Sequence, residues 1–326
     1  MIQLILRQLP LWLLRRNESD VINCYNILTP YVLRVTGGTI LNFGYWNGKT
    51  TNLVQAQNEL CTLFGKFAEL DSAKSVLDVG SGFSEPAIYW KSVYSGLDIT
   101  CLDVNFLQVK TAAGLVRIGE DNSTNAMNSK KIHQAASLIN RNPANDISLL
   151  NGTAKMLPIR DGCMDRVIAL ESAQHFKPLI QFIQESKRIL RHDDGLLVLA
   201  IPVTTTLAKS ALSSKIHGLI RLGILSLTWT SEHYELEYVK SLICRSGFGI
   251  IDIQYIGSHV YGPLADYYAQ NRKIIRSMIL NDKKSTHYHN ILYTVIERVV
   301  YISSLKMKEA FQNGFIDYVL IKAKLS

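Results

Sequence analysis

The stretch Val76-Leu77-Asp78-Val79-Gly80-Ser81-Gly82 has the pattern of a buried strand followed by a glycine loop. Pro86 follows where a helix would take its first turn, a position at which its fixed φ and missing N–H cost nothing. Glycines at such a turn let the backbone approach a ligand, and the helix N-terminus offers unpaired N–H groups to an anion. The stretch therefore predicts a strand, a tight loop and a helix that meet a nucleoside cofactor, although ordinary turns share the pattern.

Position 85 narrows the choice of cofactor. A dinucleotide fingerprint has a third glycine there, under the pyrophosphate, whereas this chain has Glu85. A carboxylate and a pyrophosphate at one helix N-terminus would repel each other. S-adenosylmethionine carries no phosphate, and it needs backbone N–H groups for its carboxylate and an acid for its ammonium group. Because Asp78 and the loop from Gly80 to Gly82 supply both, we expect this cofactor.

A second acid strengthens this prediction. The next expected strand, residues 97–104, ends close to Asp103, about 20 residues beyond the glycines. A carboxylate at this distance accepts two hydrogen bonds from the vicinal diol of a ribose. The alternative role for Asp103 is to cap the following helix.

Five segments, 76–82, 99–108, 151–176, 188–202 and 317–323, carry a resemblance to a known family. Together they resemble the class I S-adenosylmethionine-dependent methyltransferases, in particular the small-molecule group related to the ubiquinone, tocopherol, sterol and sugar methyltransferases. The resemblance implies an α/β, Rossmann-like, doubly wound sheet of seven strands with an antiparallel last strand. It also implies a helical cover at the N-terminus and a helical insertion near the C-terminus.

The resemblance also implies which residues contact the cofactor, with two departures from the family pattern. Ser84 stands where many members have a third glycine, and Thr153 replaces the acid beside adenine. We therefore expect adenine contacts from the Thr153 hydroxyl and the Ala154 backbone. The residues expected to bind the cofactor are Asp78, Gly80, Ser81, Gly82, Asp103, Val104, Gln108, Thr153, Ala154 and Glu171.

Glu171 and His175 follow the fourth expected strand, at the sheet edge where open α/β sheets bind their ligands. His175 is the candidate general base, because histidine titrates near neutrality and related small-molecule methyltransferases carry a histidine here. The alternative is a capping or core-edge histidine. Glu171 is expected to orient the sulfonium end or stabilise a cation, or else to pair with Arg166.

Four aromatic or histidine residues are candidates for contact with the methyl acceptor. Tyr45 and Trp46 resemble an N-terminal segment that related enzymes fold over cofactor and acceptor, where aromatic faces favour a cationic sulfonium. His259 and Tyr261 follow a late strand and are expected to line the acceptor pocket. For all four residues the alternative is ordinary packing.

Composition limits the partners. The chain has 326 residues and a net charge of +8, but its basic residues are dispersed and form no long stripe with interleaved aromatics. The asparagine-proline-proline-aromatic motif of nucleic-acid aminomethyltransferases is missing, so we expect a small-molecule acceptor and no nucleic acid. The five cysteines are scattered without ligand spacing, which predicts a reducing compartment and no metal site.

The expected organisation is a helical cover over 1–70, a cofactor-binding core over 71–257, a helical substrate lid over 258–312 and a last core strand over 313–326. We also expect helices over 132–138 and 206–225, and a capped helix that starts at Ser231-Glu232 and stops at Gly247. The leucine-rich start, Met1–Leu14, is too short to span a bilayer. A cytoplasmic protein is expected, with a peripheral membrane contact as the alternative and the oligomeric state open.

The sequence as a whole predicts a methyltransferase that acts on a hydroxyl of a small, apolar metabolite with His175 as the base. The first alternative is C-methylation of a prenyl, quinone or sterol-like lipid, with Glu171 and aromatic side chains stabilising a cation. A cofactor-binding protein without catalysis and a nicotinamide oxidoreductase are the alternatives from other classes.

Overall fold

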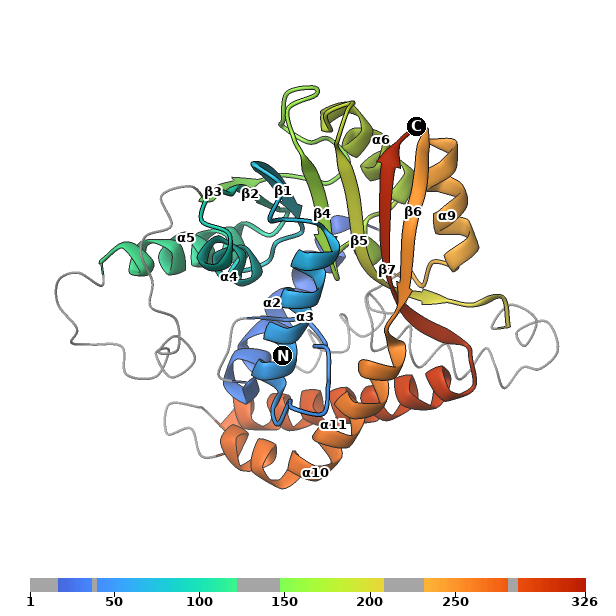
Figure 1. Ribbon diagram of the computed structural model, residues 1–326. Coiled ribbons are helices and arrows are strands. Elements are labelled where there is room, and N and C mark those ends of the chain that lie inside the picture. Colours follow the sequence, from blue (N-terminus) through green and yellow to red (C-terminus); the bar gives the residue numbers. More distant parts are fainter. Residues whose placement is uncertain (1–16, 37–39, 122–146, 208–231, 281–286) are drawn as a thin grey trace.

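The computed structural model describes residues 17–36, 40–121, 147–207, 232–280 and 287–326 (Figure 1). The predictions made for Met1–Leu14, for 132–138 and for most of 206–225 concern residues outside these ranges. The structural statements below apply to the described residues.

A seven-stranded sheet forms the centre of the fold, in the order β3-β2-β1-β4-β5-β7-β6. Strands β1 to β5 pair in parallel, whereas β7 lies antiparallel to both β5 and β6. This arrangement confirms the predicted doubly wound sheet with an antiparallel last strand. The strands are β1 (Ser75–Val79), β2 (Asp98–Asp103), β3 (Ile147–Asn151), β4 (Arg166–Leu170), β5 (Leu196–Thr204), β6 (Phe248–Tyr255) and β7 (Ile316–Leu325).

Strand β1 shows why both faces of the sheet need helices. Successive side chains of a strand point to opposite faces, and both Val76 and Leu77 are completely buried. Val76 belongs to a core cluster with residues of α3 and α4, and Leu77 belongs to a second cluster with residues of α6 and α9. The helices around the sheet are α3 (Leu53–Phe67), α4 (Glu85–Val93), α5 (Phe106–Asp121), α6 (Leu179–Ile189) and α9 (Leu236–Arg245).

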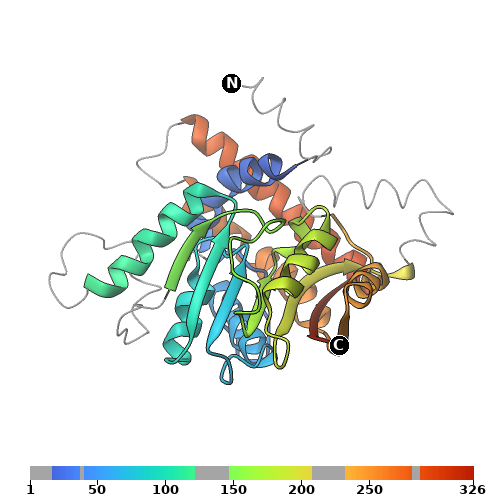
Figure 2. The same cartoon turned by 90° about the horizontal axis from the view of Figure 1, so that it is seen from above.

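Three further helices lie at one end of the sheet, with α2 (Glu18–Thr36) packed against α10 (Tyr261–Leu280) and α11 (His287–Gln312) (Figures 1 and 2). A buried carboxylate joins the last two helices, because Glu297 accepts a hydrogen bond of 2.8 Å from Arg272 Nε and lies 3.3 Å from Arg276 Nε. None of the described helices combines the length and the apolar character needed to cross a membrane. Peripheral membrane contact and cytoplasmic location stay predictions.

The helix predicted to start at Ser231-Glu232 begins later, at Leu236. The reason is that the chain before it pairs with the carboxyl end of β5 instead, where Thr204 N donates to Tyr234 O at 2.9 Å and Thr204 forms an isolated parallel bridge with Glu235. The predicted stop is confirmed, since Gly247 follows the helix with a left-handed φ of 86°.

Candidate active site

The glycine loop after β1 is pressed against the end of β4. Gly80 has a left-handed φ of 76°, and its N–H donates to Leu102 O at 2.7 Å. A Cβ at this position would lie 2.4 Å from Ser172 Cβ, so a side chain cannot be accommodated without movement of the backbone. Glycine is therefore required at position 80 by both conformation and space.

Position 84, where many members of the family have a third glycine, keeps the backbone conformation that is typical of glycine. Ser84 has a φ of 58°, in the left-handed region, and it is buried directly before α4. Pro86 lies in the first turn of α4, as predicted. Ser84 therefore adopts the turn at a backbone strain energy of roughly 1 kcal/mol or more.

Asp103 is fixed at the end of β2 by two backbone donors. Its carboxylate accepts hydrogen bonds from Gly82 N at 2.9 Å and from Asn105 N at 2.7 Å. Burial raises the pKa of Asp103, and these two N–H groups oppose that rise. Asn105 caps the start of α5, because its Oδ1 accepts a hydrogen bond of 3.1 Å from Leu107 N. The capping role considered for Asp103 therefore belongs to Asn105.

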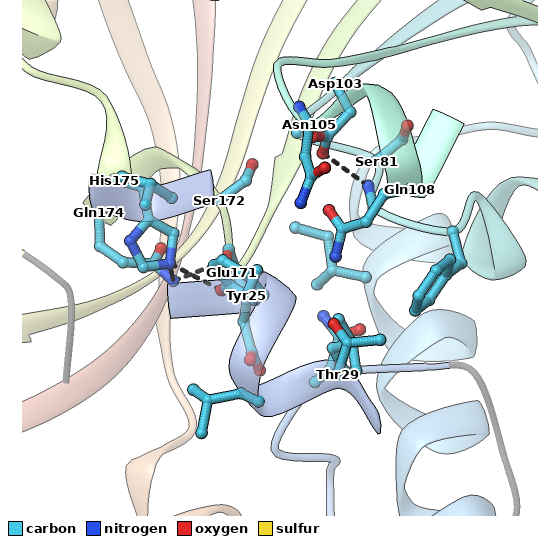
Figure 3. Close-up of a pocket in the computed structure, with 18 of the residues that line it drawn as sticks. Tyr25, Thr29, Ser81, Asp103, Asn105, Gln108, Glu171, Ser172, Gln174 and His175 are labelled. Carbon is cyan, nitrogen blue, oxygen red and sulfur yellow. Dashed lines mark hydrogen bonds between the residues drawn. The ribbon is translucent and has the colours of Figure 1, made fainter. Parts of the chain in front are cut away.

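A single cavity of about 260 Å³ joins these elements at the carboxyl ends of β1, β2 and β4 (Figure 3). Gln108 on α5 is 5% exposed, and its Nε2 has no hydrogen-bond partner among the described residues. A buried donor of this kind fits a polar ligand that supplies the missing acceptor. The predicted residues that line the cavity are Asp78, Gly80, Ser81, Gly82, Asp103, Val104, Gln108, Ala154, Glu171 and His175.

Two buried carboxyl groups in the cavity wall, those of Asp78 and Glu171, are suited to bind a cation. Burial, and then the charge of Asp103, raise the pKa of Asp78 to about 7. Burial raises the pKa of Glu171 to about 8, against hydrogen bonds from Tyr318 Oη at 2.9 Å and from Phe43 N at 3.1 Å. A nearby positive charge favours the ionised form of both groups. The wall therefore fits a ligand with an ammonium and a sulfonium group.

The alternative pairing of Glu171 with Arg166 is wrong. Arg166 lies at the opposite end of β4, where its Nε donates to Ala68 O at 2.8 Å and its Nη2 donates to Ser72 Oγ at 2.8 Å. Glu171 follows the carboxyl end of the same strand and has a left-handed φ of 53°. The two residues are five positions apart along an extended strand, so their side chains lie at different ends of the sheet.

His175 lies in the short 3-10 helix Ala173–His175 that follows β4. Its Nε2 is 2.9 Å from Tyr25 Oη of α2, and the two rings meet edge to face, with their centroids 5.5 Å apart (Figure 3). His175 lines the same cavity as the glycine loop. The structure thus brings the predicted base and the predicted cofactor residues together.

The four residues predicted to contact the acceptor do not line this cavity. Tyr45 stacks on His259, with ring centroids 4.6 Å apart, and Trp46 N donates to His259 O at 2.8 Å. Gly44, with a φ of 87°, turns the chain here, so that Phe43 lies in the cavity wall. The corrected placement is that residues 40–43 line the cavity, whereas Tyr45 and Trp46 pack against His259 outside the cavity wall.

Tyr261 and Thr153 also differ from their predicted placement. Tyr261 is buried and donates to Asp317 O at 3.2 Å, beside β7. Thr153 Oγ1 bonds Glu18 Oε1 of α2, and only its neighbours Gly152 and Ala154 reach the cavity wall. The Thr153 hydroxyl is thus directed at a protein carboxylate in the structure.

The sequence reasoning missed the contribution of α2. Tyr25 reaches His175, and Asn26 Oδ1 accepts a hydrogen bond of 2.9 Å from Asn105 Nδ2. Glu18, Tyr25 and Thr29 of this helix all line the cavity. The only available signal was the position of polar residues on an otherwise apolar helix, which does not by itself indicate a site.

Comparisons with known proteins relate the chain to methyltransferases. Residues 77–199 match a family model described as a methyltransferase domain. The chain is 23% identical over 263 residues to the erythromycin 3''-O-methyltransferase of Saccharopolyspora erythraea, which covers 79% of this chain and 77% of that protein.

Two solved structures show the same fold. One is the mycolic acid cyclopropane synthase CmaA1 in complex with SAH, with a TM-score of 0.69 and 15% identity over 92% of this chain and 95% of that chain. The other is a geranyl diphosphate C-methyltransferase from Streptomyces coelicolor A3(2), with a TM-score of 0.60 and 11% identity over 91% of this chain and 99% of that chain.

The glycine loop, the acids of β1 and β2 and the methyltransferase domain define a class I S-adenosylmethionine-dependent methyltransferase. The chain is an S-adenosylmethionine-dependent methyltransferase that is similar to the small-molecule group within that class, and S-adenosylmethionine is its cofactor.

Proposed function

We propose that the protein transfers the methyl group to a hydroxyl of a small, apolar metabolite, with His175 as the general base. The observation that carries the proposal is the 2.9 Å hydrogen bond between His175 Nε2 and Tyr25 Oη inside the cofactor cavity. It places an imidazole nitrogen next to a hydroxyl in a site that also holds the cofactor residues.

The bound cofactor supplies an electrophilic methyl group on a sulfonium. The residues that would hold it are the loop from Gly80 to Gly82, Asp78 and Asp103. The remaining requirement is removal of the acceptor proton as the oxygen–carbon bond forms. In this proposal Tyr25 Oη takes that proton while its own proton passes to His175 Nε2, so the two residues act together as the base.

The far wall of the cavity supports an apolar acceptor. Leu264 of α10 and Val299 and Met307 of α11 line it. Ser303 also lies there, but its hydroxyl donates to Val299 O at 2.7 Å within its own helix. The wall therefore offers apolar surface over most of its area, which suits the non-reacting part of such a molecule.

C-methylation of a prenyl, quinone or sterol-like lipid is the second candidate. The buried Glu171 and the adjacent Phe43 favour it, because a carboxylate and an aromatic ring can stabilise a carbocation. The structural likeness to a geranyl diphosphate C-methyltransferase also supports this candidate. This reaction does not need His175 as the group that removes a hydroxyl proton.

Incubation of the whole protein with methyl-labelled S-adenosylmethionine and a fractionated metabolite extract tests the proposal. Mass spectrometry and NMR of the labelled product identify the atom that carries the methyl group. We expect a methyl ether on an apolar molecule. A product labelled only at carbon would overturn the proposal in favour of the second candidate.

A further inference from the structure

A carboxylate from α2 occupies the part of the cavity next to the segment after β3. Glu18 lines the cavity, its Oε1 accepts the hydrogen bond from Thr153 Oγ1, and its Oε2 lies 3.3 Å from Lys155 Nζ. These contacts fix both oxygens at the edge of the cavity. Since a carboxylate can accept about four hydrogen bonds, each oxygen retains capacity for a ligand donor.

The order of residues along the cavity shows which part of the cofactor would reach Glu18. The glycine loop and Asp78 fit the amino-acid end, and Asp103 fits the ribose. Beyond Asp103 the wall continues directly into the segment after β3, because Gly152 N donates to Asp103 O at 3.1 Å. The nucleoside base is therefore the group that meets Ala154 and Glu18.

Gln108 supplies a second, independent sign of a ligand in the same cavity. The residue is 5% exposed, lines the cavity, and has an Nε2 donor without a partner among the described residues. A base that carries both a donor and ring acceptors would satisfy this donor and the Glu18 carboxylate together. Adenine has this combination, with its 6-amino group as the donor and its ring nitrogens as acceptors.

We propose that Glu18 is a specificity-determining residue that accepts a hydrogen bond from the 6-amino group of the cofactor adenine, and that Thr153 holds it in place. The carboxylate comes from a helix 135 residues away in the sequence, whereas position 153 itself carries a hydroxyl. The proposal rests on the cofactor half of the proposed function. It is independent of the acceptor and of His175.

Calorimetric titration of the whole protein with S-adenosylhomocysteine and with S-inosylhomocysteine tests this assignment. The second probe has an oxygen in place of the 6-amino group. We expect the wild type to bind the inosine analogue roughly tenfold or more weakly, because a carboxylate would face an acceptor. In Glu18→Gln we expect that preference to shrink to about threefold or less, because an amide can donate as well as accept.

Asp20→Asn is the matched control, since Asp20 lies in the same helical turn but does not line the cavity. It should keep the wild-type preference. Thr153→Val is the second variant and should lower the preference in the same direction as Glu18→Gln, with thermal melting used to confirm folding. An unchanged preference in a folded Glu18→Gln protein would overturn the assignment. Because no acceptor is present, failure of the proposed methyl transfer would leave this result unaffected.

Discussion

Tyr25 Oη lies 2.9 Å from His175 Nε2, and this contact joins two residues that are 150 positions apart in the chain. Tyr25 belongs to α2, the first described helix, whereas His175 follows β4 of the central sheet. Helix α2 is therefore part of the candidate reaction site, in addition to covering the core.

Replacement of Tyr25 by Phe tests the paired role of the two residues. The ring and its packing against His175 would remain, but the hydroxyl that bonds Nε2 would be lost. We expect the turnover rate to fall roughly tenfold or more and the pH at half-maximal rate to shift. The matched control is Tyr45→Phe, which alters a ring that stacks on His259 outside the cavity wall. A pH–rate profile of Tyr25→Phe equal to that of the wild type would exclude the role.

Cofactor affinity should depend on pH through Asp78. Its pKa is raised to about 7 by burial, so the free protein holds a proton on Asp78 at lower pH. An ammonium ligand prefers the ionised carboxylate, so binding below pH 7 requires release of that proton. We expect the Kd for S-adenosylhomocysteine to rise by up to about tenfold for each pH unit below 7. Titration calorimetry between pH 5.5 and 8 measures this effect. In Asp78→Asn the dependence should be largely lost, and an unchanged slope there would assign the titration to another group.

The same raised pKa values affect stability without ligand. Folded Asp78 and Glu171 keep protons up to about pH 7 and about pH 8, whereas the unfolded chain loses them near the ordinary values of 3.8 and 4.5. The folded state thus binds more protons between these limits, so the contribution of these groups to stability falls as pH rises. We expect Glu171→Gln to melt at a higher temperature relative to the wild type at pH 8 than at pH 5. An equal difference at both pH values would contradict this account.

Gly80→Ala should disable the cofactor loop. The new Cβ would meet Ser172 Cβ at 2.4 Å, in a backbone with a left-handed φ. We expect a loss of roughly 2 kcal/mol or more in the free energy of unfolding, together with a large loss of S-adenosylhomocysteine binding. Gly114→Ala on α5 is the control, because among the described residues a Cβ there meets no atom within 4 Å outside its chain neighbours and the backbone of its own helix. It should be neutral or slightly stabilising, as alanine favours the helix. Equal effects of the two substitutions would show that the space at Gly80 is not limiting.

The central sheet could be predicted because its signals are local. The apolar run before Gly80 and the acid at the end of the next strand follow from residue types at fixed spacing, and the structure places both as expected. The backbone at position 84 shows a limit of this approach. Serine there does not match the glycine pattern, yet its left-handed φ preserves the same turn.

The contribution of the N-terminal region could not be predicted, because it depends on contacts between distant residues. Tyr25 and Glu18 meet partners 150 and 135 residues away, and no local motif marks either one. The prediction for Tyr45 and Trp46 failed for a different reason. It identified the correct segment, but the left-handed turn at Gly44 places Phe43 in the cavity wall in their place.

The rate of methyl transfer by His175→Ala tests the central claim most directly. The labelled-methyl assay would compare the wild type with His175→Ala and with His192→Ala, which changes an exposed histidine outside the cavity wall. We expect a loss of roughly 100-fold or more for His175→Ala, with S-adenosylhomocysteine binding retained, and no change for His192→Ala. A loss of less than about threefold for His175→Ala would contradict the assignment of His175 as the general base.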